Sequence, residues 1–232
     1  MSHEPTGPAV VIGASGGIGA ALVEALREED VPVRGFARSF TGREHLDLTD
    51  DASIAAAAAT VTAPPALIVV ATGMLHDAEM RPEKSMGELD AAMLVRQFAV
   101  NAIGPALVAR HFLPLQPRTG RTVFAVLSAR IGSISDNRLG GWYGYRASKA
   151  ALNQFVRTLA IEQRRRNDRS IVVALHPGTV DTALSRPFRA GVGDDQLFTP
   201  SRAAVQLLDV IDGLRPGDSG KLFAWDGAAI EP

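Results

Sequence analysis

Short apolar runs rich in β-branched residues alternate along this chain with longer runs rich in alanine and leucine. The short runs are typical of buried strands and cover residues 8–13, 31–37, 66–71, 121–128, 170–176 and 220–225. The third run reads ALIVVA, and apolar residues on both of its faces are typical of a parallel sheet covered on both sides. We therefore expect a parallel sheet of about seven strands at the centre of the fold.

The longer runs predict the helices between these strands, at residues 17–29, 53–61, 88–112, 143–166 and 201–211. In the first of them Ile18, Leu22 and Leu26 fall on one stripe, as expected for a helix that covers a sheet. Strand–helix alternation over the whole length predicts one α/β domain, residues 1–232. Its expected architecture is a Rossmann-type, doubly wound parallel sheet flanked by helices.

The longest irregular segment covers residues 180–200 and is rich in glycine, proline and aspartate. A loop of this length in a compact domain often covers a binding site, so we predict a substrate lid here. A disordered excursion from the surface is the alternative interpretation.

Composition and charge narrow the classes of function. Lys and Arg total 24 against 25 Asp and Glu, so no strong net charge indicates nucleic acid or an anionic membrane as partner. The chain has no cysteine, which excludes disulfides and thiolate catalysis and is consistent with the cytoplasm. The N-terminal MSHEPTGPAV does not resemble a signal peptide, and we expect no apolar stretch of membrane-spanning length. No cluster of His, Asp and Glu indicates a metal site.

A glycine-rich stretch, GASGGIG at 13–19, follows the first predicted strand and opens the first predicted helix. Glycine lets the backbone turn tightly and approach a pyrophosphate, and the free N–H groups at a helix start favour an anion. This context predicts a dinucleotide loop, although the spacing is GxxxGxG, and a plain glycine-rich turn is the alternative. We expect cofactor contacts from Gly13, Ser15, Gly16, Gly17, Ile18 and Gly19.

The end of the second predicted strand indicates which dinucleotide is bound. An acidic residue there would bond the ribose 2′-hydroxyl of NAD, whereas an arginine accommodates the 2′-phosphate of NADP. Ala37 stands where the acid is expected and Arg38 follows it. This pair favours NADP(H), with NAD(H) possible, and a plain surface charge is the alternative interpretation of Arg38.

Both tyrosines of the chain lie in YGYRASK, at 143–149. Tyr145 and Lys149 are four residues apart and therefore share one face of a helix, whereas Tyr143 points elsewhere. A free phenol has a pKa of about 10, and a nearby ammonium favours the phenolate and lowers that pKa. The pair is therefore a candidate for acid–base work at a carbonyl oxygen.

These features together resemble the short-chain dehydrogenase/reductase family. GASGGIG is similar to its TGxxxGxG loop, with Ile12 in place of Thr, and Tyr145 with Lys149 is similar to its YxxxK motif. Further similar stretches are DL at 47–48, NAIG at 101–104 and HPGTVDT at 176–182. The stretch at 128–153 and the ending GKLFAWDG resemble a subgroup with the C-factor signalling proteins and related carbonyl reductases.

The resemblance implies a role for each matching residue. Tyr145 would exchange a proton with the substrate oxygen, Lys149 would assist it and hold the nicotinamide ribose, and Asn101 would fix a water beside Lys149. Cofactor contacts are implied for these three and for Asp47, Leu48, Ala71, Gly73, Pro177, Gly178, Val180 and Thr182. The resemblance also implies a small carbonyl or alcohol substrate and a homodimer or homotetramer.

Two departures from the family pattern stand out. The family's NNAG is here VATG, at 70–73, so both asparagine side chains are missing while Gly73 remains. The family's catalytic serine, the second of SSxxG, is replaced by Ala129 in SARIG. Ser133, twelve residues before Tyr145, is the candidate replacement, with Ser128 less favoured and no acting serine as a further alternative.

Two functions remain open at this stage. The first is an NADP(H)-dependent carbonyl reductase or alcohol dehydrogenase, and the second is a cofactor-binding signalling or regulatory protein with little catalysis. Five apolar side chains are candidates for a substrate pocket or for packing under the lid: Met74, Trp142, Leu184, Phe188 and Phe198. Arg130, Arg146 and Arg186 are candidates for contacts to an acidic substrate, with solvated surface charges as the alternative.

Overall fold

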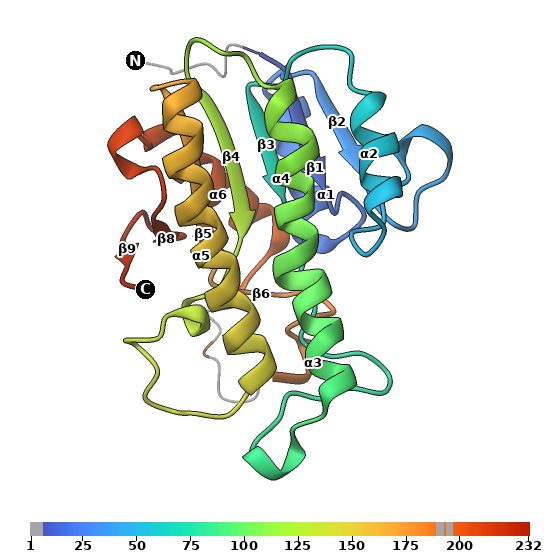
Figure 1. Cartoon of the computed structure of the whole chain (residues 1–232), viewed down its shortest axis with the longest axis vertical. Coiled ribbons are helices and arrows are strands. Elements are labelled where there is room, and N and C mark those ends of the chain that lie inside the picture. The colour runs from blue at the N-terminus through green and yellow to red at the C-terminus, as the bar shows by residue number, and fades with distance from the viewer. Residues whose placement is uncertain (1–6, 189–192, 194–196) are drawn as a thin grey trace.

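The computed structural model describes residues 7–188, 193 and 197–232. Within these residues a seven-stranded sheet has the order β2-β1-β3-β4-β5-β8-β9 (Figure 1). Its strands are β1 (Ala9–Ile12), β2 (Val33–Phe36), β3 (Leu67–Val70), β4 (Thr122–Leu127), β5 (Ser170–His176), β8 (Leu222–Ala224) and β9 (Ala229–Ile230). All neighbouring pairs are parallel except β8–β9, which is antiparallel. The predicted Rossmann-type, doubly wound sheet is confirmed, with an antiparallel edge that the sequence did not indicate.

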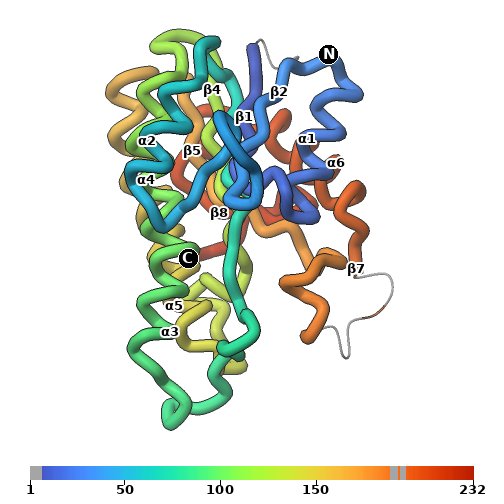
Figure 2. The backbone as a smooth tube through the Cα atoms, turned by 90° about the vertical axis from the view of Figure 1, so that its right-hand side faces the viewer, coloured from blue at the N-terminus to red at the C-terminus, as the bar shows by residue number. Residues whose placement is uncertain are grey.

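Helices cover both faces of the sheet, as Figure 2 shows from the side. One face packs against α1 (Gly17–Glu28) and α6 (Pro200–Gly213). The other packs against α2 (Asp51–Ala59), α4 (Gly104–Phe112) and α5 (Tyr143–Arg166). The helix α3 (Ala91–Phe98) extends past the end of the sheet and contacts α5 (Figure 1).

Alternation along each strand divides the core between the two helical layers. In β1, Val10 and Ile12 belong to the cluster under α2, α4 and α5, whereas Ala9 and Val11 belong to the cluster under α1 and α6. Burial of each large apolar side chain contributes roughly 1.5–3 kcal/mol. Between the two layers, the carboxyl ends of the parallel strands lie together at one end of the sheet, and the candidate site described below lies there.

Side-chain caps explain why two helices begin earlier than their apolar runs predict. Asp50 accepts a hydrogen bond from the amide of Ala52 at 3.0 Å, so α2 begins at residue 51 rather than 53. Thr199 accepts from the amide of Arg202 at 3.2 Å, and Pro200 occupies the first helical position of α6.

The predicted helix at 88–112 is not a uniform α-helix in the structure. It consists of α3, a π-helical segment (Ala99–Ile103) and α4. A π-helical turn carries one extra residue and often marks a functional site. A two-stranded sheet of β6 (Thr179–Val180) and β7 (Leu197–Phe198) was also not predicted, because two-residue strands carry no periodic signal.

The expectation that no apolar stretch reaches membrane-spanning length is wrong. The continuous helical run Ala91–Leu115 has 25 residues and is long and apolar enough to cross a membrane by length and composition. Arg96 and Arg110 interrupt the run in the sequence, but an apolar window remains. Because a core helix of a soluble protein meets the same criterion, this feature assigns no location.

Candidate active site

Two cavities lie at the carboxyl ends of the parallel strands, where open α/β sheets bind their ligands. A groove of about 830 Å³ follows the ends of β1, β2 and β3. A pocket of about 640 Å³ lies among the ends of β4 and β5, the start of α5 and residues 177–188. Ser15 and Gly16 line the groove and Ile18 lines the pocket, so the two cavities adjoin at the start of α1.

The loop from β1 into α1 presents backbone amides at this junction. The amides of Gly13 and Ala14 donate to the carbonyl oxygen of Phe36 at 2.8 and 3.0 Å, which fixes the loop beside β2. Gly13 has a φ of +90°, and a Cβ atom at Gly19 would overlap the Gly13 carbonyl oxygen. Gly16 caps α1 without a side-chain bond, and helix geometry leaves the amides of residues 17–19 without intrahelical acceptors. These amides favour an anionic group.

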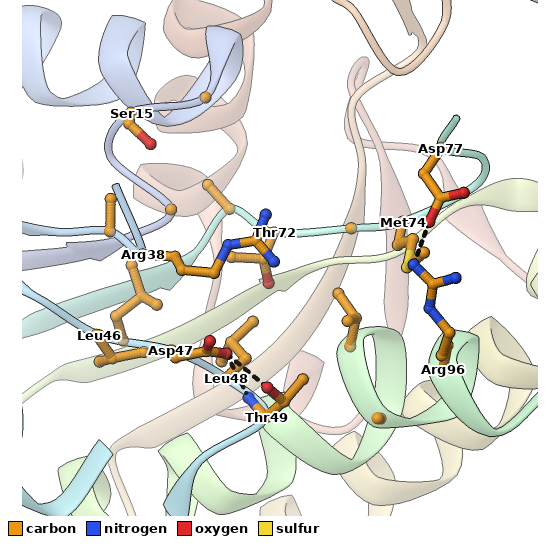
Figure 3. Close-up of a pocket in the computed structure, with 18 of the residues that line it drawn as sticks. Ser15, Arg38, Leu46, Asp47, Leu48, Thr49, Thr72, Met74, Asp77 and Arg96 are labelled. Atoms are coloured by element: carbon orange, nitrogen blue, oxygen red, sulfur yellow. Dashed lines mark hydrogen bonds and ion pairs between the residues drawn. The ribbon is translucent and has the colours of Figure 1, made fainter. Parts of the chain in front are cut away.

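Arg38 brings a positive charge to the groove just after β2. Figure 3 shows its side chain extending into the groove, between Ser15 and Asp47 in that view. The amide and hydroxyl of Thr49 donate to Asp47 at 2.9 and 2.8 Å, and the bond from the Thr49 amide is the main cause that lowers the pKa of Asp47. Ala37 is buried and brings no carboxylate to the position where an acid would repel a phosphate.

The floor of the groove fits a dinucleotide cofactor. Thr72 lines it, and the buried Thr72 hydroxyl has no hydrogen-bond partner among the described residues. Ala71, Gly73 and Leu48, for which the resemblance implies cofactor contacts, line the same groove. A Cβ atom at Gly73 would lie 3.7 Å from Nζ of Lys149, so the backbone at this position faces the centre of the site.

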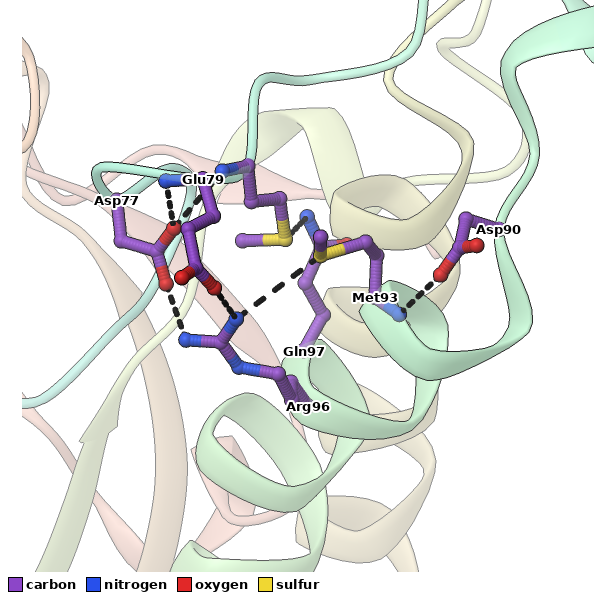
Figure 4. A network of polar contacts seen from close by, with 7 residues as sticks. Asp77, Glu79, Asp90, Met93, Arg96 and Gln97 are labelled. Carbon is purple, nitrogen blue, oxygen red and sulfur yellow. Dashed lines mark hydrogen bonds and ion pairs between the residues drawn. The ribbon is translucent and has the colours of Figure 1, made fainter.

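A polar network holds the outer wall of the groove (Figure 4). Asp77 accepts hydrogen bonds from the amides of Glu79 and Met80 at 2.9 and 2.8 Å and pairs with Arg96 of α3. The Glu79 amide is the main cause that lowers the pKa of Asp77. Arg96 also lies 3.6 Å from Glu79. The network joins the loop after β3 to α3.

Tyr145 and Lys149 lie one turn apart on α5 and are both buried. Nζ of Lys149 lies 5.8 Å from the centre of the Tyr145 ring and donates to the carbonyl oxygen of Leu127 at 2.7 Å. Burial raises the pKa of Tyr145 to about 12 and lowers the pKa of Lys149 to about 7. The structure thus differs from the expectation that the ammonium lowers the pKa of Tyr145, because loss of hydration dominates at both groups.

Asn101 lies in the π-helical segment, with its side chain fully buried. Its Oδ1 accepts from the amide of Met74 at 2.7 Å, and its Nδ2 donates to the carbonyl oxygen of Met74 at 2.8 Å. The same Nδ2 donates to Oγ of Ser148 in α5 at 3.1 Å. Asn101 therefore ties the loop after β3 to the helix that carries Tyr145 and Lys149.

The predicted Ser133 is buried beyond the turn that follows β4, outside the described lining of the pocket. Its hydroxyl accepts from the amide of Asp136 at 3.2 Å and lies 3.3 Å from Oγ of Ser135. Ser128 and Ala129 line the pocket instead, and the Ser128 hydroxyl donates to Oδ1 of Asn153 at 2.7 Å. The structure thus brings Ser133 close to its own loop rather than to Tyr145.

Aromatic contacts close one side of the pocket. Phe188 lies between His76 and Trp142, with ring centroids 5.4 and 5.0 Å away, and Trp142 in turn contacts Tyr145 at 6.4 Å. Nε2 of His76 lies 3.2 and 3.1 Å from the carbonyl oxygens of Ala183 and Leu184. Residues 180–188 of the predicted lid thus form a pocket wall, whereas 189–192 and 194–196 lie outside the described residues.

The segment after β5 also reaches the site as predicted. Pro177, Gly178, Val180 and Thr182 line the pocket, and the Thr182 methyl group lies 2.8 Å from the ideal Cβ position of Gly17. Leu184, Phe188 and Trp142 line it as well, whereas Met74 lines the groove. Phe198 packs against Trp225 at 4.7 Å and does not line either cavity.

Sequence reasoning missed three residues that the structure brings to the site. Thr72 and His76 lie in the loop that follows β3, and this place at the carboxyl end of a central strand could have marked them. His176 also lines the pocket, and its buried Nδ1 has no partner among the described residues. Burial, followed by the charge of Arg130, lowers the pKa of His176 to about 4, so its ring is neutral at pH 7.

Comparison with known proteins bears on this arrangement. A family model described as short chain dehydrogenase matches residues 8–193. C-signal of Myxococcus xanthus is 36% identical over 146 residues, which cover 63% of this chain and 82% of that protein. The 1-hydroxy-2-glutathionyl-2-methyl-3-butene dehydrogenase of Rhodococcus sp. (strain AD45) is 31% identical over 231 residues, 96% of this chain and 98% of that protein. The NADPH-bound carbonyl reductase from chicken fatty liver superposes with a TM-score of 0.82 at 26% identity, over 97% and 98% of the two chains.

Proposed function

This chain belongs to the short-chain dehydrogenase family of oxidoreductases, and from that premise we propose that it is an NADP(H)-dependent enzyme interconverting a carbonyl and an alcohol. The observation that carries the proposal is the burial of Tyr145 and Lys149 side by side, with Tyr145 lining the pocket and Lys149 close to Gly73 in the dinucleotide groove. The resemblance to an NADPH-bound carbonyl reductase supports it.

The site residues divide the chemistry between them. With its pKa at about 12, Tyr145 holds its proton at neutral pH and gives it to the substrate oxygen during reduction. With its pKa at about 7, Lys149 is both ammonium and amine near neutrality, which suits it to return a proton to Tyr145. Asn101 ties the loop after β3 to α5, and the carbonyl oxygen of Leu127 at the end of β4 holds Nζ of Lys149. When bound, NADP(H) supplies or accepts the hydride.

Arg38 supports NADP(H) over NAD(H), and the other groove residues fit either dinucleotide. The amides at the start of α1 favour a pyrophosphate, and Arg38 offers a guanidinium for a 2′-phosphate where no acid stands at residue 37. Thr72 offers an unused hydroxyl at the floor of the groove.

The test is a pair of tyrosine substitutions. Tyr145→Phe removes the proton donor and is expected to lower kcat roughly 10²- to 10⁴-fold, with NADPH binding nearly unchanged. Tyr143→Phe is the matched control, because Tyr143 is 40% exposed on the same helix, and it is expected to keep full turnover. Turnover of Tyr145→Phe at the wild-type rate would contradict the assigned role.

One observation favours a second candidate, a signalling or regulatory protein that binds the cofactor with little catalysis. Ala129 supplies no hydroxyl to the pocket, and the Ser128 hydroxyl is already bonded to Asn153. The match to C-signal supports this alternative. It predicts NADP(H) binding without reduction of any member of a broad panel of aldehydes and ketones, and turnover of one member would count against it.

A further inference from the structure

We propose that the pocket beside Tyr145 selects carbonyl substrates that carry a carboxylate on an apolar body. This inference rests on the proposed reductase function and assigns its substrate class. It rests on the charges and contacts of the residues that line the pocket.

Among the charged residues that line the pocket, positive charges outnumber negative ones. Arg130, Arg138 and Arg146 line it, and Asp136 is the one carboxylate among its described lining residues. Asp136 lies 3.5 Å from Arg130 and balances that charge. The guanidinium groups of Arg138 and Arg146 remain without a carboxylate partner among the described residues, so the pocket carries an excess of two positive charges. A cleft lined by one sign of charge attracts ligands of the opposite sign.

Arg146 is fixed in place by neutral groups. Its Nε, Nη1 and Nη2 donate to the carbonyl oxygens of Gly141, Ile131 and Gly140 at 3.0, 3.4 and 3.2 Å. These bonds use three of its five N–H groups and leave one on each Nη. Arg146 and Tyr145 both line the pocket, so this fixed charge faces the same cavity as the proton donor.

Arg138 has the opposite character. It lies in the exposed loop between β4 and α5 and makes no hydrogen bond or ion pair within the described part of the chain. A guanidinium that is not committed to other groups can bind a carboxylate with two parallel hydrogen bonds. Arg138 is thus the residue placed to bind the substrate anion, and Arg146 supplies a fixed charge to the same pocket.

The remaining lining accommodates an apolar body. Leu75, Ile131, Trp142, Leu184 and Phe188 form its wall. An aromatic or branched aliphatic group fits such a wall, with its carbonyl at Tyr145 and its carboxylate toward the arginines. A neutral substrate of the same shape makes the apolar contacts but leaves both charges unused.

A matched pair of aldehydes tests the inference on the intact protein with NADPH. Reduction of para-carboxybenzaldehyde by NADPH and one proton yields para-(hydroxymethyl)benzoate and NADP⁺, and methyl para-formylbenzoate is the neutral counterpart. We expect kcat/KM to favour the carboxylate by roughly tenfold or more, as one charge-assisted hydrogen-bonded pair provides. The preference should shrink as salt rises, because the Debye length falls from roughly 30 Å at 0.01 M to 3 Å at 1 M.

Arg138→Gln should lower kcat/KM for the carboxylate roughly tenfold and leave the ester within about twofold. Arg118→Gln removes one exposed positive charge that lines neither cavity and should leave kcat/KM unchanged for both substrates. Equal kcat/KM for acid and ester in the wild type, or equal losses for both in Arg138→Gln, would overturn the inference and leave the reductase function standing.

A binding measurement keeps the two proposals separable. Calorimetric titration of the NADP⁺ complex with para-(hydroxymethyl)benzoate and with its methyl ester does not depend on turnover. The inference is supported if the acid binds more tightly than the ester and Arg138→Gln abolishes that difference. This result would support the inference even if no aldehyde were reduced, and the missing reduction would count against the proposed catalysis alone. Equal binding of acid and ester overturns the inference.

Discussion

The buried ammonium of Lys149 destabilises the fold at neutral pH, and its replacement makes this measurable. Burial lowers the pKa of Lys149 from 10.5 to about 7, and among the described residues its Nζ donates one hydrogen bond, to the carbonyl oxygen of Leu127. Lys149→Met keeps an unbranched apolar chain of similar length in the same space. We expect this variant to be more stable than the wild type and inactive.

The magnitude follows from the two pKa values. The folded-state pKa is the lower one, so between pH 7 and 10.5 the unfolded chain binds more protons and the stability of the wild type rises with pH. At about 1.4 kcal/mol per pKa unit, burial of Lys149 costs about 4 kcal/mol at pH 7 and about 2 kcal/mol at pH 9. Loss of the bond to Leu127 offsets about 1 kcal/mol of the gain. The free energy of unfolding of the variant should therefore exceed that of the wild type by about 3 kcal/mol at pH 7 and about 1 kcal/mol at pH 9.

Urea unfolding of the cofactor-free protein at these two pH values provides the measurement. Lys84→Met is the matched control, because Lys84 is exposed, and its difference from the wild type should be small at both pH values. The reasoning would be refuted if the free energies of unfolding of wild type and Lys149→Met differed by the same amount at pH 7 and pH 9. Such a result would show that Lys149 keeps its proton in the folded state.

Three further predictions concern other parts of the site. Arg38→Gln should weaken NADPH binding roughly tenfold or more and leave NADH binding nearly unchanged in fluorescence titrations, and equal losses for both nucleotides would contradict the role of Arg38. Asn101→Ala removes both side-chain bonds to the Met74 backbone and should lower the free energy of unfolding by about 2–3 kcal/mol, measured in urea, whereas a change below about 0.5 kcal/mol would show that the loop after β3 is held by other contacts. His176 has its pKa lowered from 6.5 to about 4, so the unfolded chain binds more protons in this window and stability decreases as the pH falls from 6.5 to 4. Between pH 7 and pH 4 the free energy of unfolding of the wild type should fall by about 3 kcal/mol more than that of His176→Leu. Parallel plots of unfolding free energy against pH for the two proteins would refute this.

Much of the fold could be predicted from the sequence, because its central strands are buried on both faces. The strand β5 and the helix α5 have the predicted bounds, since a continuous apolar run and a long helical pattern are unambiguous signals. The π-helical segment at 99–103 is invisible to a helical period, and the antiparallel β9 is too short to show alternation. Both depend on contacts with distant segments.

The site was likewise predictable from the sequence only in part. The four-residue spacing of Tyr145 and Lys149 indicated a shared helix face, and both side chains are buried next to each other. Their pKa directions depend on how completely water is removed, which no spacing encodes. Ser133 has the right separation from Tyr145 along the chain, but its hydroxyl is bonded within its own loop. The direction of a side chain in an irregular turn depends on packing that the sequence pattern does not reveal.

The two aromatic contacts at residues 188 and 198 give the protein an optical readout. Trp142 and Trp225 are the only tryptophans of the chain, and they contact Phe188 and Phe198, which flank residues 189–197 on either side. The emission of each indole reports on its own aromatic contact, and Trp142→Phe and Trp225→Phe separate the two signals. Reduced nicotinamide absorbs light where tryptophan emits, so energy transfer from Trp142, beside Tyr145, follows cofactor binding without any added label.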